Sequence, residues 1–114
     1  MKVIYIAGAY RNHGMNGVWD NIMQARAVAR KIWEMGIVAI CPHTNTIFMD
    51  GEDILPDVFL EGDLEILRRC DAIFMMEGWE KSQGAVREWE LAKELDMPII
   101  YHNDYISLTN LKWG

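Results

Sequence analysis

The sequence offers little that would suit a metal site, a membrane or a nucleic acid. Neither the two cysteines, Cys41 and Cys70, nor His13 and His102 have the spacing of a metal site. No apolar run is long enough to span a bilayer, and no stretch has the pattern of a signal peptide. With 17 acidic and 11 basic residues the net charge is -6, which argues against nucleic acid or an anionic membrane as the main partner. We therefore expect a reduced, cytoplasmic protein with a small-molecule partner.

The composition suits one compact domain. The chain has 114 residues, of which 51% are hydrophobic and 25% charged, enough for a sizeable core. It contains no repeat, low-complexity segment or linker. We expect residues 1–114 to form a single domain.

Short apolar runs alternate with longer amphipathic stretches along the chain. Four runs are too short for helices and rich in strand formers, and these predict buried strands over residues 3–7, 37–41, 72–76 and 98–101. The stretches between them predict helices from about Val18 to Met35, from about Asp53 to Arg69, and from about Ser82 onward. This order predicts a Rossmann-like (flavodoxin-like) α/β domain, with a parallel sheet of four or slightly more strands and helices on both faces.

Two carboxylates fall on the apolar faces of predicted helices. They are Glu88 on the third helix and Asp63 on the second. The apolar stripes that enclose them consist of Ala85, Trp89, Ala92 and Leu95 around Glu88, and of Leu60, Leu64 and Leu67 around Asp63. A carboxylate among core positions is costly unless something pairs or uses it. Both residues are therefore candidates for a functional site.

Ligands of such a sheet bind beyond the carboxyl ends of the strands, where three loops converge. These loops span residues 8–17, 42–53 and 77–84. The first is rich in glycine, which allows close approach of the backbone to a ligand. The third leads into a helix whose free amide groups, with Ser82 as the cap, would suit a phosphate.

Four segments of the sequence carry a family resemblance: YIAGAYR, CPH, GDLEILRRCDAIFM and WEKSQGAVREWELA. The most specific element is the S-x-G-x-x-x-E spacing of Ser82, Gly84 and Glu88. In these segments the chain resembles the nucleoside 2-deoxyribosyltransferase superfamily, which includes deoxynucleoside 5'-monophosphate N-glycosidases. Within it the chain is most similar to the uncharacterised DUF4406 proteins.

The resemblance implies an enzyme that cleaves or transfers the N-glycosidic bond of a (deoxy)nucleoside or its 5'-monophosphate. It implies that Glu88 is the nucleophile, that Ser82 helps to bind the 5'-phosphate, and that Asp63 contacts the sugar or base. The ending TNLKWG is similar to a transferase segment and implies that Asn110 completes the site of a neighbouring subunit. A homodimer or larger assembly is then expected, and the reaction needs no metal or organic cofactor.

Further substrate contacts are expected from the converging loops. These residues are Gly8, Tyr10, Arg11, His43, Trp79 and Gly84. Arg11 would pair with a phosphate, while Tyr10 and Trp79 would pack on a base or sugar, because flat apolar walls suit such ligands.

Structural alternatives exist for these residues. Glu88 would be structural if it paired with Arg11 or Lys81, and Asp63 if it capped a loop or accepted backbone hydrogen bonds. His43 would then be an ordinary loop histidine. For the whole chain, the alternatives are a nucleotide-binding module without turnover and an interaction protein with an exposed apolar patch.

Overall fold

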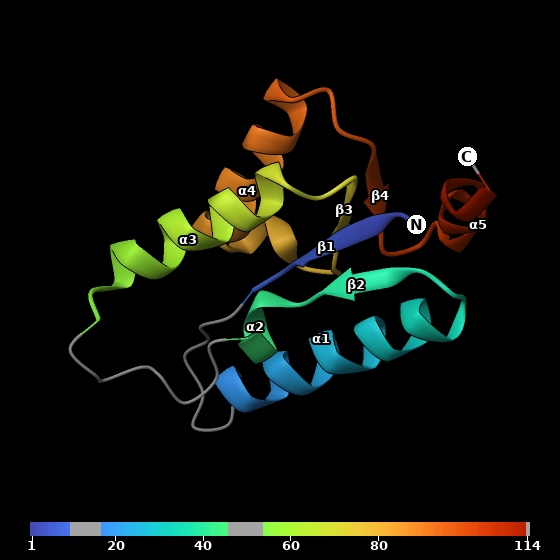
Figure 1. Cartoon of the computed structure of the whole chain (residues 1–114). Coiled ribbons are helices and arrows are strands. Elements are labelled where there is room, and N and C mark those ends of the chain that lie inside the picture. The colour runs from blue at the N-terminus through green and yellow to red at the C-terminus, as the bar shows by residue number, and fades with distance from the viewer. Residues whose placement is uncertain (10–16, 46–53, 114) are drawn as a thin grey trace.

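The computed structural model describes residues 1–9, 17–45 and 54–113, without the side chains of His43, Pro56, Lys112 and Trp113. Its elements along the chain are β1 (Val3–Ala7), α1 (Gly17–Glu34), β2 (Val38–Ile40), α2 (Pro42–Asn45), α3 (Pro56–Arg68), β3 (Ala72–Met75), the 3-10 helix η1 (Trp79–Lys81), α4 (Gln83–Glu94), β4 (Ile99–Tyr101) and α5 (Tyr105–Trp113) (Figure 1).

The four strands form one parallel sheet in the order β2-β1-β3-β4. Strand β1 lies in the interior of the sheet and pairs with both β2 and β3, whereas β2 and β4 form the edges. All four strands occur where the sequence predicts them, three of them shorter by one or two residues. The order is that of a flavodoxin-like doubly wound sheet, and the predicted fold class is confirmed.

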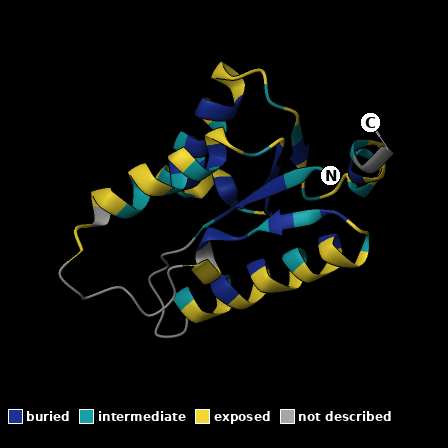
Figure 2. Ribbon diagram, viewed as in Figure 1, coloured by how far each residue is buried: buried dark blue, intermediate teal, exposed yellow. Residues whose placement is uncertain are grey.

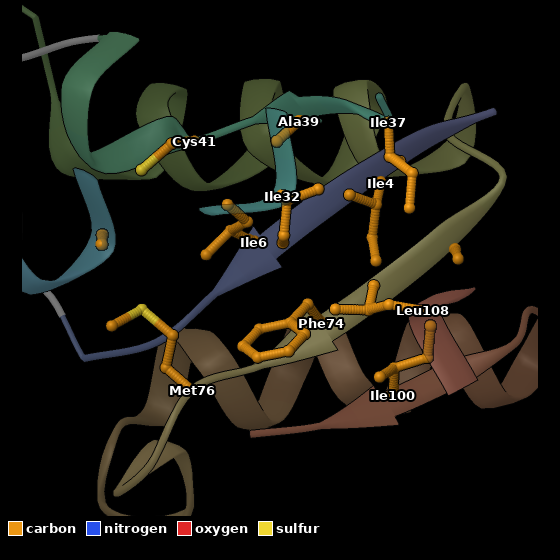
Figure 3. Packing of buried hydrophobic residues seen from close by; sticks show 12 residues of the cluster. Ile4, Ile6, Ile32, Ile37, Ala39, Cys41, Phe74, Met76, Ile100 and Leu108 are labelled. Atoms are coloured by element: carbon orange, nitrogen blue, oxygen red, sulfur yellow. The ribbon is translucent and has the colours of Figure 1, made fainter. Parts of the chain in front are cut away.

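Helices cover both faces of the sheet, and alternate side chains of β1 serve the two layers. Ile4 and Ile6 belong to a core cluster beneath α1 and α5, which Figure 3 shows from close by. Tyr5 and Ala7 point to the other face and belong to a second cluster beneath α3 and α4. The inner strands β1 and β3 are accordingly almost entirely buried and the edge strands β2 and β4 only partly, while each long helix buries one side only (Figure 2).

The helix boundaries follow local backbone chemistry. Helix α1 ends where expected, because Gly36 adopts a positive φ of 83° and turns the chain towards β2. Helix α3 begins at Pro56, so the predicted start at Asp53 is wrong. Leu55 is extended (φ -70°, ψ 144°), since a proline ring disfavours helical backbone in the residue before it, and Pro56 itself suits the first helical turn.

Three elements of the structure were not predicted: α2, η1 and α5. In the described part of the chain, no helix combines the length and the apolar character needed to cross a membrane.

Candidate active site

Glu88 lies on the inner side of α4 with only 8% of its surface exposed. It is the one charged side chain that is buried within the described ranges. The prediction that it falls on the apolar face of its helix is confirmed, since Ala85, Leu91 and Ala92 are buried on the same side. Leu95 was wrongly assigned to that face: it follows the last helical residue and is 44% exposed.

The partner of Glu88 is Tyr5, from the interior strand β1. The Tyr5 hydroxyl donates a hydrogen bond to Oε2 of Glu88, and the Tyr5 side chain is fully buried. Burial, followed by the negative charge of Glu88, raises the pKa of the phenol, so that Tyr5 stays protonated and acts as the donor. Sequence reasoning missed Tyr5, which is hidden in the apolar run VIYIA.

The environment of Glu88 favours its neutral form. Burial raises the pKa of this carboxyl to about 8, the Tyr5 hydrogen bond opposes the rise, and the charge of Asp63 adds to it. Tyr5 therefore stabilises the ionised carboxylate at a position where its surroundings would otherwise suppress ionisation.

Asp63 brings a second acid to the same face of the sheet. It lies half-buried on α3, one residue before the buried Leu64, and its charge acts on both Glu88 and Tyr5. Burial raises the pKa of Asp63 to about 6. The structure thus brings together two carboxyl groups with raised pKa values, an arrangement common at catalytic sites.

The amino end of α4 carries the predicted cap. The Ser82 side-chain oxygen accepts a hydrogen bond of 3.2 Å from the amide of Ala85, which confirms Ser82 as the N-cap. The hydroxyl proton of Ser82 is not used in this bond and remains a donor. Gly84 lies in the first turn, where an added Cβ would meet nothing closer than Ser82 Oγ at 3.9 Å. Their predicted contacts with substrate stay predictions.

Lys81, one of the two proposed ion partners of Glu88, is exposed at the end of η1, just before α4. With Arg87 it borders a hollow of about 330 Å³. The other residues that line the hollow are Glu80, Gln83, Val86 and Glu90. Among the described residues, the ion pairs join Arg30 to Glu34 and both Arg68 and Arg69 to Glu65. Arg11, the other proposed partner, lies outside the described residues, as does Tyr10.

Trp79 packs in the core layer beside the site. Its side chain is only 9% exposed, and its ring centroid lies 5.1 Å from that of Trp89 and 6.3 Å from that of Tyr101. This packing joins η1 to α4 and β4. Contact between Trp79 and a base or sugar stays a prediction.

Gly8, at the carboxyl end of β1, is needed for a packing reason that the sequence did not indicate. A Cβ built on Gly8 would lie 2.9 Å from Sδ and 3.0 Å from Cβ of Met76, closer than side chains approach one another. A role of Gly8 in substrate binding stays a prediction. The side chain of His43, on the short helix α2, is outside the described residues.

Asn110 is not brought to Glu88 within this chain. It is exposed on α5, whose Leu108 packs into the core cluster on the opposite face of the sheet. Its predicted role in a neighbouring subunit is untested. Within the described ranges, no three His, Cys, Asp or Glu side chains lie close enough to hold a metal ion.

Comparison with known proteins agrees with this fold. The family described as "Domain of unknown function (DUF4406)" matches residues 2–101. A solved structure of the 2-deoxyribosyltransferase from the psychrotolerant bacterium Bacillus psychrosaccharolyticus matches with a TM-score of 0.62 and 18% identity, over 87% of this chain and 70% of that one. The 2-deoxyribosyltransferase from Leishmania mexicana matches with a TM-score of 0.60 and 22% identity, over 89% of this chain and 63% of that one. The chain therefore spans slightly less than two thirds of the Leishmania enzyme. None of the curated proteins matches it in sequence.

Proposed function

The chain belongs to the DUF4406 family, and from this premise and the geometry around Glu88 we propose that it cleaves or transfers the N-glycosidic bond of a (deoxy)nucleoside or its 5'-monophosphate. The observation that carries the proposal is the buried Glu88, held by the Tyr5 hydroxyl beside a second carboxyl group, Asp63. The fold shared with two 2-deoxyribosyltransferases supports it.

Glu88 acts as the nucleophile in this proposal. Its carboxylate attacks the anomeric carbon of the sugar, the bond from that carbon to the base nitrogen breaks, and a glycosyl ester forms on Glu88. Tyr5 contacts Oε2, so Oε1 is the oxygen that attacks. Because the transition state resembles an oxocarbenium ion, its positive charge stabilises the ionised carboxylate as the reaction proceeds.

Asp63 serves the leaving base or the sugar. With a pKa of about 6 it exchanges protons readily near neutral pH, which suits a group that protonates a departing base. Alternatively, its carboxylate accepts a hydrogen bond from a sugar hydroxyl. Water or a second base then attacks the anomeric carbon, releases Glu88 and completes hydrolysis or transfer respectively.

The amino end of α4 holds the phosphate if the substrate is a nucleotide. The amide groups between Ser82 and Gly84 lie at the positive end of the helix, and the Ser82 hydroxyl adds a donor. Arg11 and Tyr10 from the first loop, His43 from the second, and the other contacts expected from the sequence belong to the same proposal.

The test is incubation with a panel of nucleosides, deoxynucleosides and 5'-monophosphates, with and without a second free base, followed by chromatography of the bases. Glu88→Gln should lower the rate on the order of 1,000-fold or more, because the neutral amide cannot form the ester. Glu90→Gln is the matched control, since Glu90 is an exposed carboxylate on the same helix and should leave the rate unchanged.

Base release without exchange identifies a hydrolase, and exchange identifies a transferase. No turnover of any substrate, with nucleotide binding that survives Glu88→Gln, would instead establish a binding module.

A further inference from the structure

Phe59 on α3 is a large aromatic side chain that neither core cluster of the described residues includes. It is half-buried, whereas the next residue, Leu60, packs against the cluster beneath α3 and α4. Further along the helix, Leu64 and Leu67 are buried in the same cluster. The packing of the described core therefore accounts for the apolar stripe of α3 but not for Phe59.

Phe59 lies on the same side of α3 as Asp63, one turn closer to the start of the helix. Residues at this spacing are separated by about 40° around a helix and by about 6 Å along it, so that their side chains are neighbours. The charge of Asp63 acts on both Glu88 and Tyr5, which means that this side of α3 faces the candidate active site. Phe59 therefore flanks the same site as Asp63.

The start of α3 lies on the side of the sheet where ligands bind. The helix ends at Arg68, shortly before β3, and in this connection the amide of Asp71 donates to the carbonyl of Val3 at the amino end of β1. Helix α3 thus runs against the strands, and its first turns extend beyond the carboxyl end of β1 (Figure 1). Because the Cα–Cβ bonds of a helix tilt towards its start, the side chain of Phe59 is directed towards this edge. Ligands of such a sheet bind beyond it.

A base bound at this site needs an apolar wall. In the proposed reaction the sugar lies at Glu88 and the departing base lies beside Asp63, so the base extends from there towards the carboxyl edge of the sheet. The ring of Trp79 is only 9% exposed and already packs on two other aromatic rings. Phe59, one turn beyond Asp63, offers a flat apolar face at the level of the base.

We propose that the ring of Phe59 packs on the face of the substrate's base and supplies much of the affinity for it. This inference rests on the proposed function, because it takes the position of the base from Glu88 and Asp63. Stacking of a base on an aromatic ring uses the face of the base and not its hydrogen-bonding groups. Phe59 therefore favours a ligand that carries a base over the corresponding sugar without one.

Isothermal titration calorimetry tests the contact, with every substitution made in the Glu88→Gln protein so that no ligand is consumed. The ligands are the common deoxynucleosides and their 5'-monophosphates, with deoxyribose and deoxyribose 5-phosphate as matched ligands that lack the base. Phe59→Ala should weaken binding of the base-carrying ligands about tenfold and leave the affinity for the ligands without a base unchanged. Phe59→Tyr keeps the ring and should keep the affinity.

Val58→Ala is the matched control. Val58 is the preceding residue of α3 and is 59% exposed, about 100° around the helix from Phe59. Its truncation should change none of these affinities. Circular dichroism verifies that each variant is folded.

Two results would overturn the inference while leaving the proposed function intact. One is an unchanged affinity for every base-carrying ligand in Phe59→Ala. The other is an equal loss for the ligands without a base, which would show that Phe59 only supports the fold of the site.

Turnover by the wild type tests the proposed function separately. Binding without turnover, weakened by Phe59→Ala for the base-carrying ligands alone, would keep the Phe59 contact and remove the catalytic role. Absence of both binding and turnover would overturn the proposed function, and this inference with it.

Discussion

Replacement of Glu88 by glutamine should make the unfolding free energy of the protein less dependent on pH. The folded protein raises the pKa of Glu88 to about 8, from an ordinary value of 4.5. Between these two pH values the folded state keeps a proton that the unfolded state has lost. The contribution of Glu88 is therefore fully present below pH 4.5 and is lost as the pH rises through 8.

The magnitude follows from this interval. Each pH unit over which only the folded state holds the proton lowers the unfolding free energy by about 1.4 kcal/mol. From pH 4.5 to pH 8, wild type should lose up to about 5 kcal/mol relative to Glu88→Gln. Glutamine keeps the volume of the side chain and can accept the Tyr5 hydrogen bond, so the two proteins should have similar stability at pH 4.5.

Urea denaturation at half-unit intervals from pH 4.5 to 9 measures the difference. Asp63 also titrates in this range, with a pKa of about 6, but it is present in both proteins and largely cancels in the comparison. Glu90→Gln serves as the control for loss of an exposed carboxylate from the same helix. A constant difference between wild type and Glu88→Gln across the range would refute the argument that burial holds a proton on Glu88.

Three other substitutions test separate parts of the site. Tyr5→Phe removes the donor that stabilises ionised Glu88, so the pKa of Glu88 should rise above its value of about 8, seen by NMR titration of the side-chain carboxyl carbon. Ser82→Ala should lower the unfolding free energy by about 1 kcal/mol through loss of the helix cap, and Ser82→Thr should restore most of it in urea denaturation. Gly8→Ala should cost about 1–3 kcal/mol because its Cβ meets Met76, and in a double-mutant cycle Met76→Ala should absorb part of that cost.

The sequence predicts the sheet well because its strands are buried on both faces. Such strands appear as uninterrupted apolar runs, and four runs give four strands. The same continuity hides which residues point to which face. Tyr5 is one of five apolar residues in a row, and only the packing of α4 against β1 reveals that its hydroxyl meets Glu88.

Helical periodicity is more informative about the site. A carboxylate on an apolar stripe stands out, and both Glu88 and Asp63 were found in this way. The role of Trp79 could not be judged from its position in a loop, because the aromatic neighbours that enclose it come from α4 and β4. Helix α5 was missed because its apolar residues do not follow one stripe: Leu108 is fully buried, whereas Ile106 is 77% exposed.

The position of β1 within the sheet affects the order in which the protein can fold. β1 is the first of the four strands to be synthesised, but its two neighbours follow only with Val38–Ile40 and Ala72–Met75. Tyr5 reaches its partner later still, once residue 88 has been made. The contacts of β1 at the centre of the sheet therefore cannot all form until most of these residues have been synthesised. Contacts between residues so far apart in sequence slow folding. Until α4 has been made, the face of β1 that carries Tyr5 lacks one of the two helices that cover it.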